Sequence, residues 1–198
     1  MRAPRFDRSD FVLTKGLLVL LALGLPALTV GGPLVAWWRG RPLTWELDGL
    51  SATLVPPDLR PSSGVRLSGT GTVGVSIPSA ATSTWLASLL PGLALSATGL
   101  VIAWQLLRVV RRIEQRRAFV ASTASAFRVI ALALFLGSLV LAVAQGVADA
   151  QISQRALSMG DFEVTVPLLP SVGALLVLAL AEAFGQGARL QDDVEGLV

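Results

Sequence analysis

Residues 129–148 read VIALALFLGSLVLAVAQGVA, twenty residues without a charged side chain between Arg128 and Asp149. An α-helix rises about 1.5 Å per residue, so a run of this length matches the roughly 30 Å of hydrocarbon in a bilayer. The run also lacks the polar stripe that a helix on a soluble core shows to water. The stretch is therefore predicted to span a membrane as a helix.

Three further stretches have the same character, and Trp85 and Trp104 bracket one of them, 85–107, as interface-seeking indoles do. Of all residues 53% are hydrophobic and only 15% are charged, whereas about a quarter are charged in soluble domains. Four buried helices of a soluble protein would leave too little polar chain to cover them in 198 residues. The predicted fold class is an all-α integral membrane protein with four transmembrane helices, at 16–38, 85–107, 129–148 and 164–181.

The stretch 16–38 has an alternative interpretation, because charged residues before an apolar run also occur in a cleaved signal peptide. Its apolar run is longer than the usual core of a signal peptide, however, and it ends in the bulky Trp37 and Trp38. We therefore expect it to remain in the protein as a transmembrane helix.

Arginine and lysine are unevenly distributed over the segments between the spans. If the spans cross in alternation, residues 1–15, 108–128 and 182–198 share one side and carry eleven of these residues, against five in 39–84 and 149–163. Positive residues in short segments favour the cytoplasm, which predicts that both termini are cytoplasmic. Fifteen arginines stand against the single Lys15, a bias that suggests a bacterial protein and hence a bacterial plasma membrane.

The segment 39–84 is the only sizeable polar piece, and we expect it outside the cytoplasm. Leu43, Trp45 and Leu47 alternate with polar residues, and the run TGTVGVSI (70–77) alternates in the same way. Such alternation, with turn-forming sequences between the runs, predicts a small antiparallel β-rich unit. So small a sheet is marginal alone, so we expect it to rest on the membrane face or on the loop 149–163.

Arginines cluster directly after the second span. If that span continues as a helix into the cytoplasm, most of them fall along one face. They can contact anionic lipid headgroups, or they can dock an acidic cytosolic or membrane partner. Direct nucleic-acid binding is not expected, because no aromatic platform is interleaved with them. The residues are Arg108, Arg111, Arg112, Arg116 and Arg117.

The first span contains a candidate break. Pro26 removes one helix hydrogen bond, and Gly31-Gly32-Pro33 can unwind the helix further on. Unwound backbone of this kind exposes ion ligands in many transporters, although glycine and proline also serve packing in membrane helices. A small-solute transporter or channel component is therefore the alternative function.

The composition argues against an enzyme. Cysteine, histidine and tyrosine are all absent, which removes thiol and histidine chemistry, and no metal-ligand or phosphate-binding pattern is present. No cofactor, metal or catalytic residue is predicted. Asp192 and Asp193 read as a solvated acidic tail, and Glu182 reads as an interfacial acid that could instead pair with Arg128 or the arginines.

Two parts of the chain resemble the DUF2975 family of small four-helix bacterial membrane proteins. One is the ending LAEAFGQGARLQDDVEGLV (180–198), and the other is Phe119 through Arg128 leading into the third span. The usual Gly-x-Pro-Phe of the family is replaced by Arg116-Arg117-Ala118-Phe119. The resemblance implies four spans, a plasma-membrane location and no established activity, and relatives encoded beside a helix-turn-helix regulator suggest a membrane-linked regulatory role. We therefore expect a non-enzymatic accessory or regulatory membrane subunit.

Overall fold

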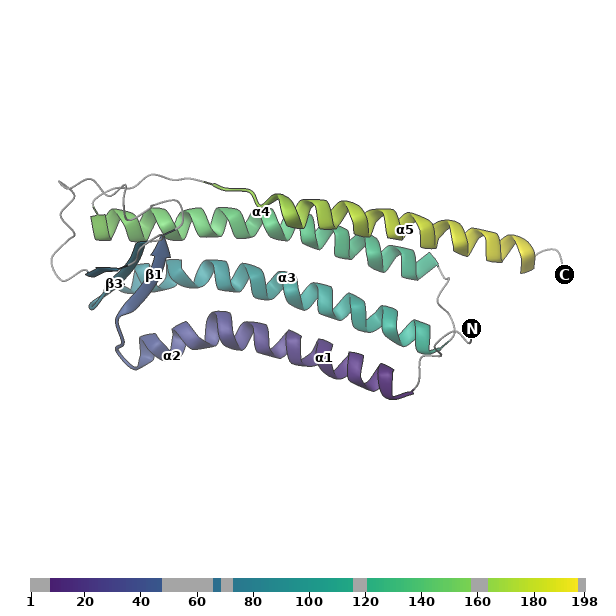
Figure 1. Cartoon of the computed structure of the whole chain (residues 1–198), viewed down its shortest axis with the longest axis horizontal. Helices are drawn as coiled ribbons and strands as arrows, with labels where there is room; N and C mark the ends of the chain where they lie inside the picture. The colour runs from purple at the N-terminus through teal and green to yellow at the C-terminus, as the bar shows by residue number, and fades with distance from the viewer. Residues whose placement is uncertain (1–7, 48–65, 69–72, 116–120, 158–163, 196–198) are drawn as a thin grey trace. The chain divides into compact units, whose positions relative to one another are not determined.

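The fold was analysed in a computed structural model, which describes residues 8–47, 66–68, 73–115, 121–157 and 164–195 (Figure 1). The chain divides into two compact units. The arginine unit comprises Met1–Leu25, Ser96–Ser138 and Pro167–Val198, and the sheet unit comprises Pro26–Leu95 and Leu139–Val166. The elements in chain order are α1 (Arg8–Pro26), η1 (Ala27–Gly31), α2 (Gly32–Trp38), β1 (Leu43–Leu47), β2 (Arg66–Ser68), β3 (Val73–Ile77), α3 (Thr82–Glu114), α4 (Ala121–Leu157) and α5 (Leu168–Glu195).

Among the described residues, four helical stretches are long and apolar enough to cross a membrane. The predicted class, an all-α membrane protein with a small β-rich segment between the first two spans, is confirmed. The last helix begins at Leu168, whereas residues 164–167 of the expected span are not helical. Pro167 explains this start, because the residue before a proline avoids helical geometry. The stretches are Phe11–Trp38, Thr82–Glu114, Thr123–Ala156 and Leu168–Leu190.

The expected break at Gly31–Pro33 is not an unwound segment, and the hypothesis of exposed backbone there is wrong. Gly31 has φ −64° and ψ −42°, and Gly32 has φ −58° and ψ −56°, so both are helical. Between α1 and α2 the chain makes the π-helical turn η1, in which the N–H of Gly32 donates to the carbonyl of Ala27. Pro33 has no N–H, and its ring would clash with the carbonyl four residues earlier in a regular α-helix. One wider turn accommodates the proline and keeps the helix going.

In the sheet unit, η1 lies tightly against α3. A Cβ atom on Gly92 would meet the carbonyl group of Thr29 and lie 3.1 Å from its carbon, so only glycine permits this approach. The hydroxyl of Thr29 donates to the carbonyl of Gly92 at 3.4 Å. The glycine thus serves helix packing, as small residues commonly do in membrane bundles.

The three strands form an antiparallel sheet in the order β1-β3-β2. The alternation in the sequence predicted β1 and β3, and the register pairs Leu43 with Ile77 and Leu47 with Val73. Leu43 and Leu47 are buried, whereas Thr44 and Glu46 between them are exposed. The short strand β2 was not predicted.

The core of the sheet unit joins the sheet to α3 and α4. Leu43, Leu47 and Val75 pack with Trp85 of α3 and with Ile152 and Ala156 of α4. The segment from Asp149 to Leu157 was predicted as loop, and this is wrong, because α4 continues through it. Ala148, Ile152 and Ala156 recur every four residues on one helix face and are fully buried, which is why the helix persists there.

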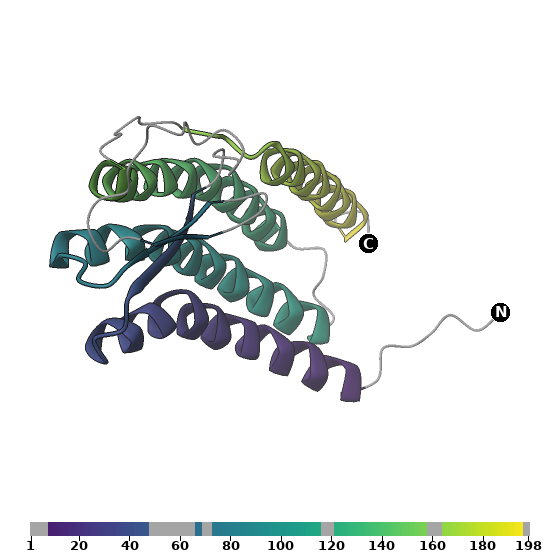
Figure 2. The same ribbon diagram turned by 60° about the vertical axis from the view of Figure 1, so that its left-hand side comes forward.

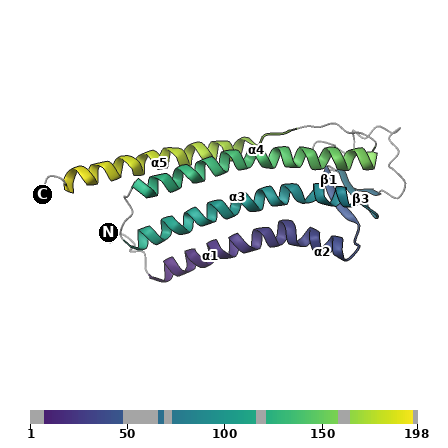
Figure 3. The same ribbon diagram turned by 180° about the vertical axis from the view of Figure 1, so that it is seen from behind.

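In the arginine unit α1, the end of α3, the start of α4 and α5 lie side by side (Figures 1, 2 and 3). Small residues sit where these helices meet: Gly99 of α3 faces Leu25, and Gly137 of α4 faces Thr98. A Cβ atom on Gly185 of α5 would lie 3.8 Å from the Cβ of Ala124 in α4. The outward side chains are mostly large and apolar, as lipid contact requires.

Candidate functional sites

The cationic end of α3 keeps its arginines in solvent. Arg108 and Arg111 are exposed, and Arg112 is half-buried and has an interaction of its own. The guanidinium carbon of Arg108 lies 5.4 Å from the centroid of the Trp104 ring, which places it in cation–π contact. The second span was predicted to continue as a helix beyond residue 107. It does so, because α3 extends through Glu114.

Two described acids of the arginine unit are paired within the chain. Glu114 forms an ion pair with Lys15 of α1. Glu182 of α5 lies 3.6 Å from Arg128 of α4, and the two side chains are 56% and 57% exposed. Glu182 is therefore an exposed acid that also has a basic neighbour, so the two alternatives considered for it coexist.

An aromatic contact holds α5 beside α4 at this end. The rings of Phe127 and Phe184 stack with centroids 5.2 Å apart and planes 25° from parallel. Gln186 donates to the carboxylate of Glu182 at 3.5 Å, one helical turn away. The contacts position the last turns of α5 next to the start of α4.

Four of the predicted site residues have side chains outside the described part of the chain. Arg116 and Arg117 lie outside the described residues. Asp192 and Asp193 fall on the last turns of α5, but their side chains are outside the described part of the chain. Within the described ranges, no three acidic, histidine or cysteine side chains come together as a metal site would require.

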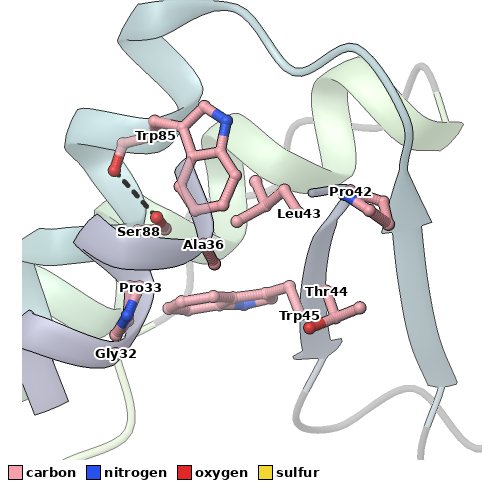
Figure 4. Close-up of a pocket in the computed structure, with 9 residues that line it drawn as sticks. All are labelled: Gly32, Pro33, Ala36, Pro42, Leu43, Thr44, Trp45, Trp85 and Ser88. Atoms are coloured by element: carbon pink, nitrogen blue, oxygen red, sulfur yellow. Dashed lines mark hydrogen bonds between the residues drawn. The ribbon is translucent and has the colours of Figure 1, made fainter. Parts of the chain in front are cut away.

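The sheet unit contains a second candidate, a tryptophan-lined pocket of about 260 Å³ (Figure 4). In the close-up, the Trp45 ring extends from Thr44 towards Pro33 and Ala36, and Trp85 and Leu43 lie on the opposite side. No charged side chain is among the residues that line it. They are Gly32, Pro33, Ala36, Pro42, Leu43, Thr44, Trp45, Trp85 and Ser88.

Each indole has a neighbour that contacts its ring. The Nε1–H of Trp45 donates to the Oδ1 atom of Asp149 at 2.7 Å. Trp37 stacks on Trp85 with centroids 6.2 Å apart, and the hydroxyl of Ser88 donates to the carbonyl of Trp85 at 2.8 Å. The pocket was missed from the sequence because Trp45 and Asp149 are 104 positions apart. The inward alternation of β1 was its only local signal.

The chain matches a known protein family over about its last two thirds. Residues 68–198 match the model of the family described as a protein of unknown function, DUF2975. The chain belongs to the DUF2975 family. The match contains both segments that carried the resemblance, whereas α1, η1, α2 and β1 of this DUF2975 protein precede it. Comparisons with curated proteins and with solved structures each found no match.

Proposed function

We propose that this DUF2975 protein is a non-enzymatic accessory or regulatory subunit of a bacterial plasma membrane. In this proposal both termini are cytoplasmic, and the exposed arginines at the end of α3 dock an acidic surface of a partner protein. Anionic lipid headgroups compete for the same side chains. No catalytic residue, metal or cofactor takes part in the proposed role.

The proposed orientation rests on the distribution of charge. Residues 1–15, 108–128 and 182–198, which share one side if the spans cross in alternation, hold eleven of the sixteen basic residues. An even number of crossings returns the chain to the side from which it started. The positive-inside rule then favours the cytoplasm for that side.

One observation carries the docking proposal: the described acids near the arginines already have basic neighbours. Glu114 pairs with Lys15 and Glu182 lies beside Arg128. Among the described side chains, Arg108 and Arg111 form no ion pair and stay exposed. Positive charge is therefore left over on the end of α3, and an external anion is the natural complement.

The transporter alternative loses the feature on which it depended. It required unwound backbone at Gly31–Pro33, where the chain is helical. Gly92 of α3, which lies against η1, is accounted for by packing against Thr29. The accessory role is therefore the better supported of the two.

The test compares two paired substitutions in the native host. We expect Arg108→Gln with Arg111→Gln to lose a stoichiometric partner that copurifies with the unaltered protein in mild detergent. Each cation near a surface contributes roughly 1 kcal/mol, so the double change lowers affinity by roughly thirtyfold. The matched control is Arg39→Gln with Arg41→Gln, which removes two exposed arginines near the sheet and retains the partner.

Copurifying lipid distinguishes a protein partner from lipid headgroups. Loss of anionic lipid from the purified Arg108→Gln, Arg111→Gln protein, together with an unchanged set of copurifying proteins, assigns the arginines to headgroups instead of a partner. A set of copurifying proteins unaffected by both double variants, or solute flux through the purified protein in proteoliposomes, contradicts the proposed function.

A further inference from the structure

We propose that the tryptophan-lined pocket of the sheet unit binds the ester-proximal part of a membrane-lipid acyl chain. The inference concerns a different unit from the arginines and is independent of the proposed docking. It rests on the lining, the volume and the chain segments that contribute to the pocket.

The chemistry of the lining selects an uncharged apolar group. Pro33, Ala36 and Leu43 supply aliphatic surface, and Trp45 and Trp85 supply two indoles. A buried charge without a partner would be costly there, since no charged side chain lines the pocket. The volume of about 260 Å³ exceeds the roughly 150 Å³ of an apolar cavity that accepts benzene, so a segment of hydrocarbon chain fits.

The pocket has one end outside the candidate spans and one end within them. Thr44, whose side chain is exposed, lies in β1 outside the candidate spans. Gly32, Pro33 and Ala36 lie within the candidate span Phe11–Trp38, and Ser88 lies within Thr82–Glu114. The Trp45 ring bridges the two ends (Figure 4).

This position across the ends of the spans matches the upper part of a lipid chain. A lipid ester carries an acceptor oxygen at the boundary of the hydrocarbon, where the Thr44 hydroxyl can donate to it. The methylene groups next to the ester would then run along the Trp45 ring towards Pro33. A free hydrocarbon or aromatic molecule lacks this ester, and a terminal methyl end of a chain lies too deep in the leaflet to reach Thr44.

The walls of the pocket are preorganised for binding. Asp149 orients the Trp45 indole through the 2.7 Å hydrogen bond, and Trp37 stacks on Trp85. Rigid aromatic walls reduce the entropy lost on binding. An organic cation held against the indoles near the carboxylate of Asp149 is the competing ligand.

The experiment uses the whole protein in lipid vesicles with two photoreactive phospholipids. One carries a diazirine next to the ester and the other carries it at the chain terminus. We expect the first to crosslink to the peptides containing Leu43–Trp45 and Trp85–Ser88 more strongly than the second. Mass spectrometry locates the crosslinks.

A variant that fills the pocket tests whether the crosslink depends on the pocket. A Cβ atom on Gly32 meets nothing within 4 Å, so the backbone accepts a side chain there, and Gly32→Leu is expected to place leucine at the pocket. It should lower the ester-proximal crosslink at least about fivefold, because leucine occupies volume that the chain would fill. Gly24→Leu is the matched control: its Cβ also meets nothing, and Gly24 is not a pocket residue, so crosslinking stays unchanged.

A second variant guards against misfolding of the first. Thr44→Val keeps the shape of an exposed strand residue and removes only its hydroxyl, so we expect a smaller loss of the ester-proximal crosslink. The proposal is overturned if both variants crosslink like the unaltered protein. It is also overturned if a small aromatic diazirine labels these peptides while neither lipid does, or if tetraethylammonium abolishes the lipid crosslink.

Discussion

Leu176→Arg is expected to expel α5 from the membrane in most molecules. The Leu176 side chain is 64% exposed and belongs to the candidate span Leu168–Leu190, so it faces hydrocarbon if that helix crosses the bilayer. Arginine near the centre of a span costs about 3 kcal/mol relative to leucine, on the order of a hundredfold in the insertion equilibrium. Glycosylation mapping or protease protection of the segment after α5 measures the insertion.

The control for this change is Leu190→Arg, whose side chain is equally open to the surroundings at 66% exposure. Leu190 lies at the end of the candidate span, where a long cationic side chain can reach the interface, so insertion should be nearly normal. A soluble helix would tolerate arginine at both places alike. Equal behaviour of the two variants would therefore contradict a membrane environment for α5.

Trp85→Ala is expected to destabilise the sheet unit by about 3–5 kcal/mol, the usual effect of removing a buried tryptophan. The side chain is 4% exposed, stacks on Trp37 and packs in the core with Leu43 and Ile152. Its loss leaves a void that this small sheet has little other core to offset. Thermal unfolding in detergent, followed by the remaining tryptophan fluorescence, measures the change.

Trp104→Ala is the matched substitution in the arginine unit. The Trp104 side chain is 59% exposed, and its described contact is with the Arg108 guanidinium. An exposed cation–π contact is worth about 0.5–1 kcal/mol, so the unfolding temperature should barely move. If the two tryptophan variants unfold together, Trp85 is not the core residue that its burial indicates.

Much of the fold could be predicted because hydrocarbon imposes a simple rule on the sequence. Long uncharged runs such as 129–148 predict membrane helices without knowledge of what packs against them. The alternation around Leu43 and Leu47 predicted β1 for an equally local reason. The strand β2 covers only Arg66–Ser68, which is too short to carry a pattern.

Two predictions were wrong, the loop at 149–157 and the break at Gly31–Pro33, because each relied on one or two residues without the neighbouring sequence. Asp149 and Arg155 interrupt the apolar run but do not end the helix. Ala148, Ile152 and Ala156 recur at every fourth position and are buried, and this helical spacing of apolar residues indicates that the helix continues. The break at Pro33 was predicted because proline interrupts a regular α-helix. The chain instead forms one wider, π-helical turn before the proline.

The sites depended on contacts that a single sequence does not reveal. Lys15 and Glu114 are 99 positions apart, and nothing local says that this acid is already paired. The arginines were visible as a cluster, but the absence of an acidic partner for Arg108 and Arg111 among the described side chains became visible only with the partners of Glu114 and Glu182 in place.

Four crossings with the arginine-bearing ends inside can be tested most directly with single cysteines, because the chain has none of its own. Ser79, Gln115 and Gln186 are exposed and can each be replaced in turn. We expect a membrane-impermeant maleimide to label Ser79→Cys in intact cells, and to label Gln115→Cys and Gln186→Cys only after permeabilisation. Labelling of Gln115→Cys and Gln186→Cys from opposite sides, or the reverse pattern for all three, would contradict this account.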